Sequence, residues 1–157
     1  MTNNSRINFN IIFNSTIPII IGALIYIFFR TNSLFVFNWL KTIGLYDFVI
    51  YLRTFTIPYR NYLPHWILFS LPDALWTYSI TYLMLGIWCF EKSNIKYLWI
   101  FLGPFVGITS EILQIYKVIP GTFDVVDLYL ILFFVLFTFS SFYIQLHQKK
   151  KMKNNEN

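Results

Sequence analysis

The sequence predicts an all-α protein, an integral membrane helical bundle with four transmembrane helices, or five if one further apolar segment also crosses. Two observations carry this prediction. Apolar residues make up 57% of the 157 residues and charged residues only 12%, about half the charged share of an ordinary soluble domain. Several stretches also approach the ~20 largely apolar residues that a helix needs to cross a bilayer.

Composition also restricts the partners. The net charge of +5 comes from lysines and arginines at the ends of apolar stretches and in one tail, a pattern that indicates membrane topology and not a nucleic-acid groove. The single cysteine, Cys89, excludes an internal disulfide and a multi-cysteine metal site. We therefore expect contacts with membrane lipids and none with nucleic acid.

The first predicted span is Ile11–Phe29, which contains 19 residues without a charge. A signal peptide is the alternative, but Arg30 follows the run and no small-residue cleavage site is visible, so the sequence favours a retained helix. Residues 1–10 before it form a polar N-terminus. Asn10 and Asn14 are one helical turn apart and are expected to face the bundle.

The segment Leu34–Leu52 leaves two interpretations open. It is apolar enough for a transmembrane helix, but Lys41 and Asp47 interrupt it, and each charge costs about 2.5–3.5 kcal/mol at the bilayer centre. A helix that lies in the membrane interface, rich in Trp, Tyr and Phe, accommodates these charges better. The sequence therefore favours an interfacial helix here and four spans in total.

The second predicted span begins at Ser70 and continues to about Phe90. Ser70 is a candidate N-cap, Pro72 suits the first turn of a helix, and Asp73 stands three residues after Ser70, as in a capping box. These signals predict that Asp73 lies at the very start of its helix.

Polar or small residues recur at helical spacing in this helix and in the next, which is expected over Tyr97–Val118. Asp73, Thr77 and Thr81 are spaced by four and form one stripe. Four residues line one face of the following helix: Gly103, Gly107, Glu111 and Gln114. The two glycines form a GxxxG pair that allows close helix approach, so Glu111 is expected to face other helices and not lipid.

The last helix is expected to follow a turn at Pro120–Gly121, with Thr122 or Asp124 as its N-cap, and to continue to about Gln145. Residues 146–157 form a basic, lysine-rich tail that is expected to be disordered.

Lysine and arginine favour the cytoplasmic side of a membrane, so the tail predicts a multi-pass protein of the cell membrane with a cytoplasmic C-terminus. Within the single transmembrane domain, residues 11–145, this orientation brings five polar side chains near the extracytoplasmic ends of their helices. The predicted binding residues are Asp73, Glu111, Gln114, Asp124 and Asp127. Because an ionisable group is costly in an apolar segment, the sequence predicts a functional acidic pocket open to the extracytoplasmic side.

Asp73 with Tyr78 or Tyr82 resembles the start of a helix in a known family, and three further short motifs within about residues 70–135 are similar to motifs of the same family. They are Glu111-Ile-Leu-Gln114, Gly121-Thr-Phe-Asp124 and Asp127. Together they resemble the signature of the VanZ-like membrane proteins, with Thr122 and Ile131 where that family has Arg and Asn. The resemblance implies a VanZ-like transmembrane domain of the cell envelope, whose acidic pocket is expected to bind a polar lipid or a lipid-linked envelope precursor.

Structural roles are open for the same acids. Asp73, Asp124 and Asp127 can act as helix caps, which the helix dipole favours by about 0.3–1 kcal/mol each. Glu111 can be a neutral acid that joins helices by hydrogen bonds, in a structural subunit that binds a membrane-protein partner. The four carboxylates can alternatively hold a divalent cation.

Catalysis has no recognisable motif in this sequence. There is no Ser-His-Asp or Cys-His pattern and no phosphate-binding glycine loop, and neither histidine stands at zinc-ligand spacing from another ligand. We therefore expect no cofactor, no bound metal and no defined catalytic residue. A small intramembrane enzyme that uses paired carboxylates is the alternative function.

Overall fold

The computed structural model describes the backbone of residues 3–31, 35–119 and 121–155, without the side chains of 3–9, 149, 150 and 152–155. Every regular element in this part of the chain is a helix, so the all-α prediction is confirmed. The helices are α1 (Asn3–Phe29), α2 (Phe35–Thr42), α3 (Tyr46–Thr56), η1 (Ile57–Tyr62), α4 (His65–Trp88), α5 (Ile95–Ile100), α6 (Leu102–Ile115) and α7 (Val125–Asn155).

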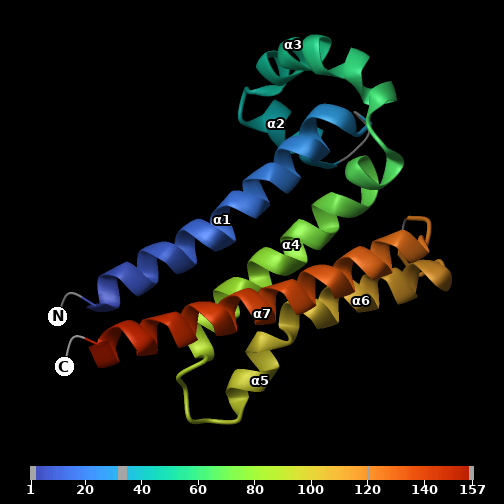
Figure 1. Cartoon of the computed structure of the whole chain (residues 1–157). Helices are drawn as coiled ribbons and strands as arrows, with labels where there is room; N and C mark the ends of the chain where they lie inside the picture. The colour runs from blue at the N-terminus through green and yellow to red at the C-terminus, as the bar shows by residue number, and fades with distance from the viewer. Residues whose placement is uncertain (1–2, 32–34, 120, 156–157) are drawn as a thin grey trace.

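The long segments α1, α4, α5–α6 and α7 run in alternating directions (Figure 1). The central helix is α4, which packs against α1, α6 and α7. Helices α2, α3 and η1 fold over the end of α1, and we call them the hood. We call the end of the bundle that carries the hood the hood end. The α6–α7 loop lies at this end, and the α4–α5 loop lies at the opposite end.

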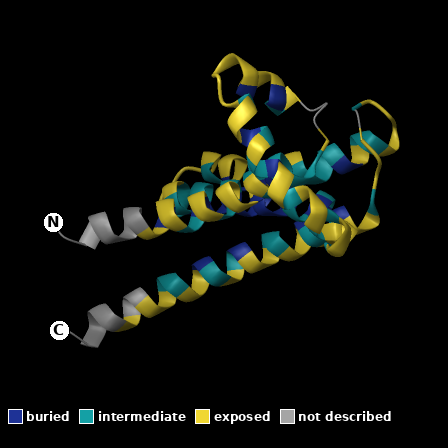
Figure 2. Cartoon of the chain, turned by 90° about the horizontal axis from the view of Figure 1, so that it is seen from above, coloured by how far each residue is buried: buried dark blue, intermediate teal, exposed yellow. Residues whose placement is uncertain are grey.

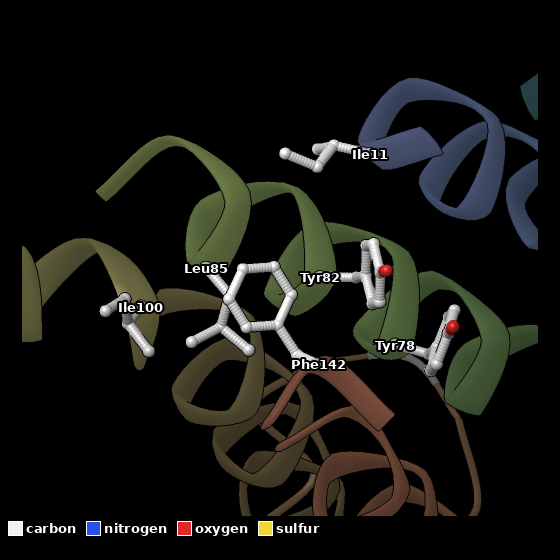
Figure 3. Close-up of a cluster of buried hydrophobic side chains, with 6 residues drawn as sticks. All are labelled: Ile11, Tyr78, Tyr82, Leu85, Ile100 and Phe142. Carbon is white, nitrogen blue, oxygen red and sulfur yellow. The ribbon is translucent and has the colours of Figure 1, made fainter. Parts of the chain in front are cut away.

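The central place of α4 follows from its small hydroxyl side chains. Thr77, Ser79 and Thr81 are buried, and each donates its hydroxyl to a carbonyl four residues earlier in the same helix. This back-bonding satisfies the hydroxyls locally and leaves short side chains, so neighbouring helices can come close. A hydrophobic cluster joins α1, α4, α5 and α7 (Figure 3): Ile11, Tyr78, Tyr82, Leu85, Ile100 and Phe142.

A neutral polar network lies beside this cluster and ties the same helices together. The Tyr82 hydroxyl donates to Gln145 Oε1 at 2.8 Å and accepts a hydrogen bond from Asn14 Nδ2 at 3.3 Å. We call these three residues the tyrosine network. The prediction that Asn14 faces the bundle is therefore confirmed, whereas Asn10, also predicted to face it, is exposed.

Among the described residues, two helices are long and apolar enough to cross a membrane, Asn10–Phe29 within α1 and Val125–Gln148 within α7. Only 11% of the first window and 28% of the second are buried against the rest of the chain, whereas a core helix of a soluble protein is mostly buried. Most residues of both windows are therefore not buried by the rest of the chain, and Figure 2 shows these helices largely in the colours of exposed and intermediate residues. Helix α6 is apolar but has only 14 residues.

The predicted start of the second span at Ser70 is wrong. Helix α4 begins at His65 with Pro64 in the N-cap position, so Ser70, Pro72 and Asp73 all lie inside it. The Pro72 ring lacks an N–H and leaves the carbonyl of Leu68 without its usual partner, but the helix continues through it. The capping box suggested by the sequence is therefore absent, and Asp73 is not a helix cap.

The helix predicted over Tyr97–Val118 is divided in two. Helix α5 ends at Ile100 and α6 starts at Leu102, because Pro104 has no N–H for the Ile100 carbonyl. Helix α6 then ends at Ile115, because Lys117 takes the left-handed conformation with φ 54°. The amides of Lys117 and Val118 reach back to the carbonyls of Gln114 and Leu113, which is a Schellman end.

The segment Leu34–Leu52 is not one helix, although Leu34 itself lies outside the described residues. Gly44 has φ 74° and ends α2, and α3 starts anew at Tyr46. Helices of 8 and 11 residues reach only about 12 and 17 Å at 1.5 Å per residue, short of the ~30 Å hydrocarbon core. Neither helix can cross a bilayer, which removes the candidate fifth span.

Arg53 anchors the hood to the end of α1. Its guanidinium donates hydrogen bonds to the carbonyls of Ile27 and of Arg30, the latter at 2.7 Å, and its charge lies 5.0 Å from the centre of the Phe37 ring. The carbonyls at a helix C-terminus favour such a cation. Burial and the neighbouring Arg60 lower the pKa of Arg53, but arginine keeps its charge in proteins.

The C-terminal tail is helical as far as Asn155, because α7 continues well past the expected end at Gln145. The prediction of a disordered tail over 146–157 is therefore wrong for the described residues of that range. No glycine or proline follows Gly121, and lysine and glutamine are good helix formers. The predicted turn at Pro120–Gly121 is described only in part, because Pro120 lies outside the described residues.

Candidate functional site

The register between α4 and α6 positions the candidate site. A Cβ atom added to Gly103 would lie 2.7 Å from Thr81 Oγ1, and one added to Gly107 would lie 2.8 Å from Thr77 Oγ1. The two helices are antiparallel, so each step of four residues along one is matched by four residues back along the other. The predicted close approach through the GxxxG pair is confirmed. The two glycines of α6 face the polar stripe of α4.

One further step in this register brings Asp73 of α4 opposite Glu111 of α6. Helix α7 joins them at the same level, because Ile131 packs 3.4 Å from the Gly107 position and Asp127 lies one turn before Ile131. Both Asp127 and Asp73 lie within electrostatic range of Glu111. Three helices therefore bring Asp73, Glu111 and Asp127 together, and we call these residues the acid cluster.

Two members of the acid cluster are buried without full hydrogen bonding. Glu111 is 2% exposed and Asp127 is 9% exposed. Glu111 Oε1 accepts a hydrogen bond from Gln114 Nε2 at 3.4 Å, and the backbone N–H of Asp124 is also within hydrogen-bonding reach of this carboxylate. Glu111 Oε2 and Asp127 Oδ1 have no partner, although an unpaired buried polar atom costs about 1–3 kcal/mol.

Gln114 is held in place by the loop that follows α6. A Cβ atom on Gly121 would lie 2.7 Å from the carboxamide of Gln114, and Gly121 has φ 146°. Only glycine combines this backbone conformation with room for the amide of Gln114 beneath it. Gln114 thus lies between the loop and Glu111, with its Nε2 3.4 Å from Glu111 Oε1.

Asp124 has a different role from the other predicted site residues. Its Oδ1 accepts a hydrogen bond from the backbone N–H of Val126 at 2.9 Å, which makes it the N-cap of α7. The prediction of an N-cap at Thr122 or Asp124 is confirmed for Asp124.

Asp73 forms the exposed side of the acid cluster. Arg30, at the end of α1, lies within electrostatic range of it, and its guanidinium lies 4.7 Å from the centre of the Phe69 ring, one turn before Asp73 on α4. The cluster thus has a buried part, formed by Glu111 and Asp127, and an open part where a carboxylate and a guanidinium lie close to each other.

Sequence reasoning missed two residues of this region, Arg30 and Ser70. Ser70 is fully buried and its Oγ has no hydrogen-bond partner. It stands seven residues before Thr77 and so on the same face of α4, a signal that the capping interpretation concealed. Arg30 had no signal of its own, because only the packing of α1 on α4 brings its side chain near Asp73.

The acid cluster is not arranged to hold a metal. Among the described residues, no group of three or more His, Cys, Asp or Glu side chains lies close enough together to coordinate an ion. The alternative of a divalent cation held by the four carboxylates is therefore not supported. Ionised carboxylates are hydrogen-bond acceptors only, so their unpaired oxygens can be satisfied by donors from a ligand or by a bound proton.

No protein-family model matches the chain, and no curated protein or solved structure is significantly similar to it.

Proposed function

We propose that the chain is a multi-pass protein of the cell membrane, similar to the VanZ-like envelope proteins, and that its acid cluster binds the polar head of a lipid or of a lipid-linked envelope precursor. The proposal joins two kinds of support, the apolar exterior of the bundle and the unsatisfied carboxylates within it. Neither the VanZ-like motifs nor the apolar helices alone identify a ligand.

A membrane location is supported by α1 and α7, which are long, apolar and mostly unburied. The other two segments have suitable lengths for this role. Helix α4 has 24 residues, and α5 with α6 extends from Ile95 to Ile115 with a single break. At 1.5 Å per residue both reach ~30 Å or more, and alternating directions would give four crossings. The lysine-rich end of α7 favours a cytoplasmic C-terminus, which puts the hood and the acid cluster toward the extracytoplasmic side.

The observation that carries the binding role is the set of unpaired buried oxygens. Among the described residues four buried side-chain polar atoms lack a partner. One is Arg53 Nε in the hood, and the other three are oxygens contributed by α4, α6 and α7: Ser70 Oγ, Glu111 Oε2 and Asp127 Oδ1. Native proteins leave few such atoms, and each calls for an explanation. A polar headgroup that enters beside exposed Asp73 would satisfy them.

The experiment compares Glu111→Gln with wild type in purified protein. Thermal unfolding is followed in detergent micelles, with and without added membrane lipids. We expect the variant to unfold like wild type without lipid and to lose the lipid-induced rise in Tm. Glu91→Gln is the matched control, because Glu91 is an exposed carboxylate in the α4–α5 loop at the other end of the bundle. A Glu111→Gln protein that keeps the full lipid shift would contradict the proposal.

One observation favours a second candidate, a purely structural role for Glu111. Its hydrogen bond from Gln114 is the kind that a neutral, helix-joining acid makes. This role predicts that Glu111→Ala unfolds the protein, that Glu111→Gln does not, and that any lipid shift is the same in Glu111→Gln and wild type. The two variants measured together therefore separate the two candidates.

A further inference from the structure

The unpaired atoms of the acid cluster determine whether a ligand must supply hydrogen-bond donors or acceptors. Glu111 Oε2 and Asp127 Oδ1 are carboxylate oxygens, which accept hydrogen bonds and donate none when ionised. Ser70 Oγ, buried on the same face of α4 as Thr77, can accept a further bond. A ligand that satisfies these atoms must bring several N–H or O–H donors.

The charges around these atoms favour a cation. Asp127, Asp73 and Asp124 all act electrostatically on Glu111, so four carboxylates share one region. Arg30 is the one basic residue that acts on Asp73 within the described part of the chain. An anionic headgroup that met the carboxylates would be repelled, and a neutral one would leave their charges unbalanced at low dielectric.

Among cations, the geometry selects against two classes. A metal ion has no suitable ligand set, since no group of three or more candidate ligands lies together in the described residues. A quaternary ammonium has no N–H to offer and is usually held by aromatic faces, whereas the unpaired atoms here are oxygens. A primary ammonium carries three N–H donors and a full positive charge, which matches acceptor oxygens contributed by α4, α6 and α7.

We infer, resting on the function proposed above, that the acid cluster recognises a primary ammonium group next to a phosphate, as in an ethanolamine headgroup. The ammonium enters between Glu111 and Asp127, and the phosphate lies on the open side against Arg30. The Arg30 guanidinium is suited to this, because it is a fork of donors that binds phosphate oxygens in pairs. Its stacking on the Phe69 ring keeps it next to Asp73, at the entrance to the cluster.

The test is a titration of purified full-length protein with three phospholipids that share the same short acyl chains. Phosphatidylethanolamine carries a primary ammonium, phosphatidylcholine a quaternary ammonium, and phosphatidylglycerol hydroxyl groups with a net negative charge. The rise in Tm and the apparent Kd are measured for each. We expect phosphatidylethanolamine to bind at least about tenfold more tightly than the other two, the size of one charge-assisted hydrogen bond.

Two variants connect that preference to the proposed contacts. Glu111→Gln keeps the shape and the contact with Gln114 and should weaken phosphatidylethanolamine binding at least about tenfold. Arg30→Gln should weaken it as well, whereas Arg60→Gln, the same change within the hood, should not. A preference for phosphatidylethanolamine that survives both Glu111→Gln and Arg30→Gln would overturn the inference.

The outcomes separate this inference from the function on which it rests. Equal binding of the three lipids, lost in each case with Glu111→Gln, would overturn ammonium recognition and leave headgroup binding intact. If Glu111→Gln weakens the binding of none of the three lipids, both ammonium recognition and headgroup binding by the acid cluster are overturned. Free phosphoethanolamine that binds as tightly as the lipid would support ammonium recognition and assign it to a soluble ligand.

Discussion

The tyrosine network and the acid cluster both join α4 to neighbouring helices through polar side chains, but they differ in how those side chains form hydrogen bonds. In the tyrosine network, the Tyr82 hydroxyl both donates and accepts, with Gln145 and Asn14 as partners. In the acid cluster, Glu111 and Asp127 bring two acceptor groups together and leave an oxygen of each unpaired. The polar groups of the tyrosine network satisfy one another within the chain, whereas those of the acid cluster do not.

The difference lies in whether buried polar groups can satisfy one another by hydrogen bonds. Hydroxyl and amide groups can satisfy one another, so a neutral network stabilises helix packing where water is excluded. Two ionised carboxylates cannot satisfy one another, because both are hydrogen-bond acceptors and both carry a negative charge. Burying them costs free energy unless a cation, a donor-rich ligand or a proton is present, and this cost is the reason for the binding role proposed above.

Gly107→Val should have the largest effect on stability and should remove the acid cluster while sparing the tyrosine network. A side chain at this position meets Thr77 Oγ1 at 2.8 Å and Ile131 at 3.4 Å. Overpacking of this kind costs about 1–3 kcal/mol, so the free energy of unfolding in mixed micelles should fall by that amount. The lipid-induced rise in Tm should vanish as well. Gly107→Ala, with the same first contact but less bulk, should show a smaller loss.

Tyr82→Phe should break the complete network without disturbing the binding site. The change removes the hydroxyl that joins Asn14 and Gln145, and we expect a loss of about 0.6–1.7 kcal/mol in the free energy of unfolding. The lipid shift should stay at its wild-type value. The control is Tyr143→Phe, which removes an exposed hydroxyl from α7 and should change neither quantity. A lost lipid shift in Tyr82→Phe would mean that the two places are not independent.

Glu111→Gln should behave in the opposite way to Tyr82→Phe. The amide keeps an acceptor for Gln114 and removes one charge from among the carboxylates. Replacing a buried charge by a neutral group of similar shape is often neutral or stabilising, so the free energy of unfolding should be unchanged or about 1 kcal/mol higher in the absence of lipid. Chemical unfolding of variant and wild type measures this. A loss as large as that of Tyr82→Phe would contradict the expectation that the buried charge of Glu111 costs stability in the absence of lipid.

Lys117→Gly should give a small gain in the free energy of unfolding and leave lipid binding unchanged. Lys117 has φ 54° at the end of α6, a conformation that costs ordinary residues about 1–2 kcal/mol and glycine little. Part of this gain is offset by the entropy of glycine in the unfolded chain, so we expect about 0.5–1 kcal/mol. Lys92→Gly, in the exposed α4–α5 loop, is the comparison and should give no gain. Because the Lys117 turn leads into the loop over Gln114, an unaltered lipid shift would show that the turn is purely structural.

Local pattern alone was sufficient for several features of this protein. The apolar runs determined that the chain is all-helical and where α1 and α7 lie, because their composition leaves few other ways to bury or shield them. The spacing of Gly103, Gly107 and Glu111 determined that these residues share one helix face. The Asp124 cap was visible as well, because a cap depends only on residues near in sequence.

Tertiary packing decided the rest. Ser70 and Asp73 looked like a helix start, but helix α4 begins earlier, at His65, and this places both residues inside the helix, on the side of the polar stripe. The hood itself bends at Gly44 and is anchored by Arg53, a contact between residues far apart in the chain.

The acid cluster shows the physical reason for this division. Periodicity tells which residues share a face of one helix, but not which residue of the next helix stands opposite. That register comes from the close contacts of Gly103 with Thr81 and of Gly107 with Thr77, and it alone brings Asp73 and Glu111 to one level. The sequence by itself determined which acids are unusual, and only the packed helices decided that they meet and that two of their oxygens remain unpaired.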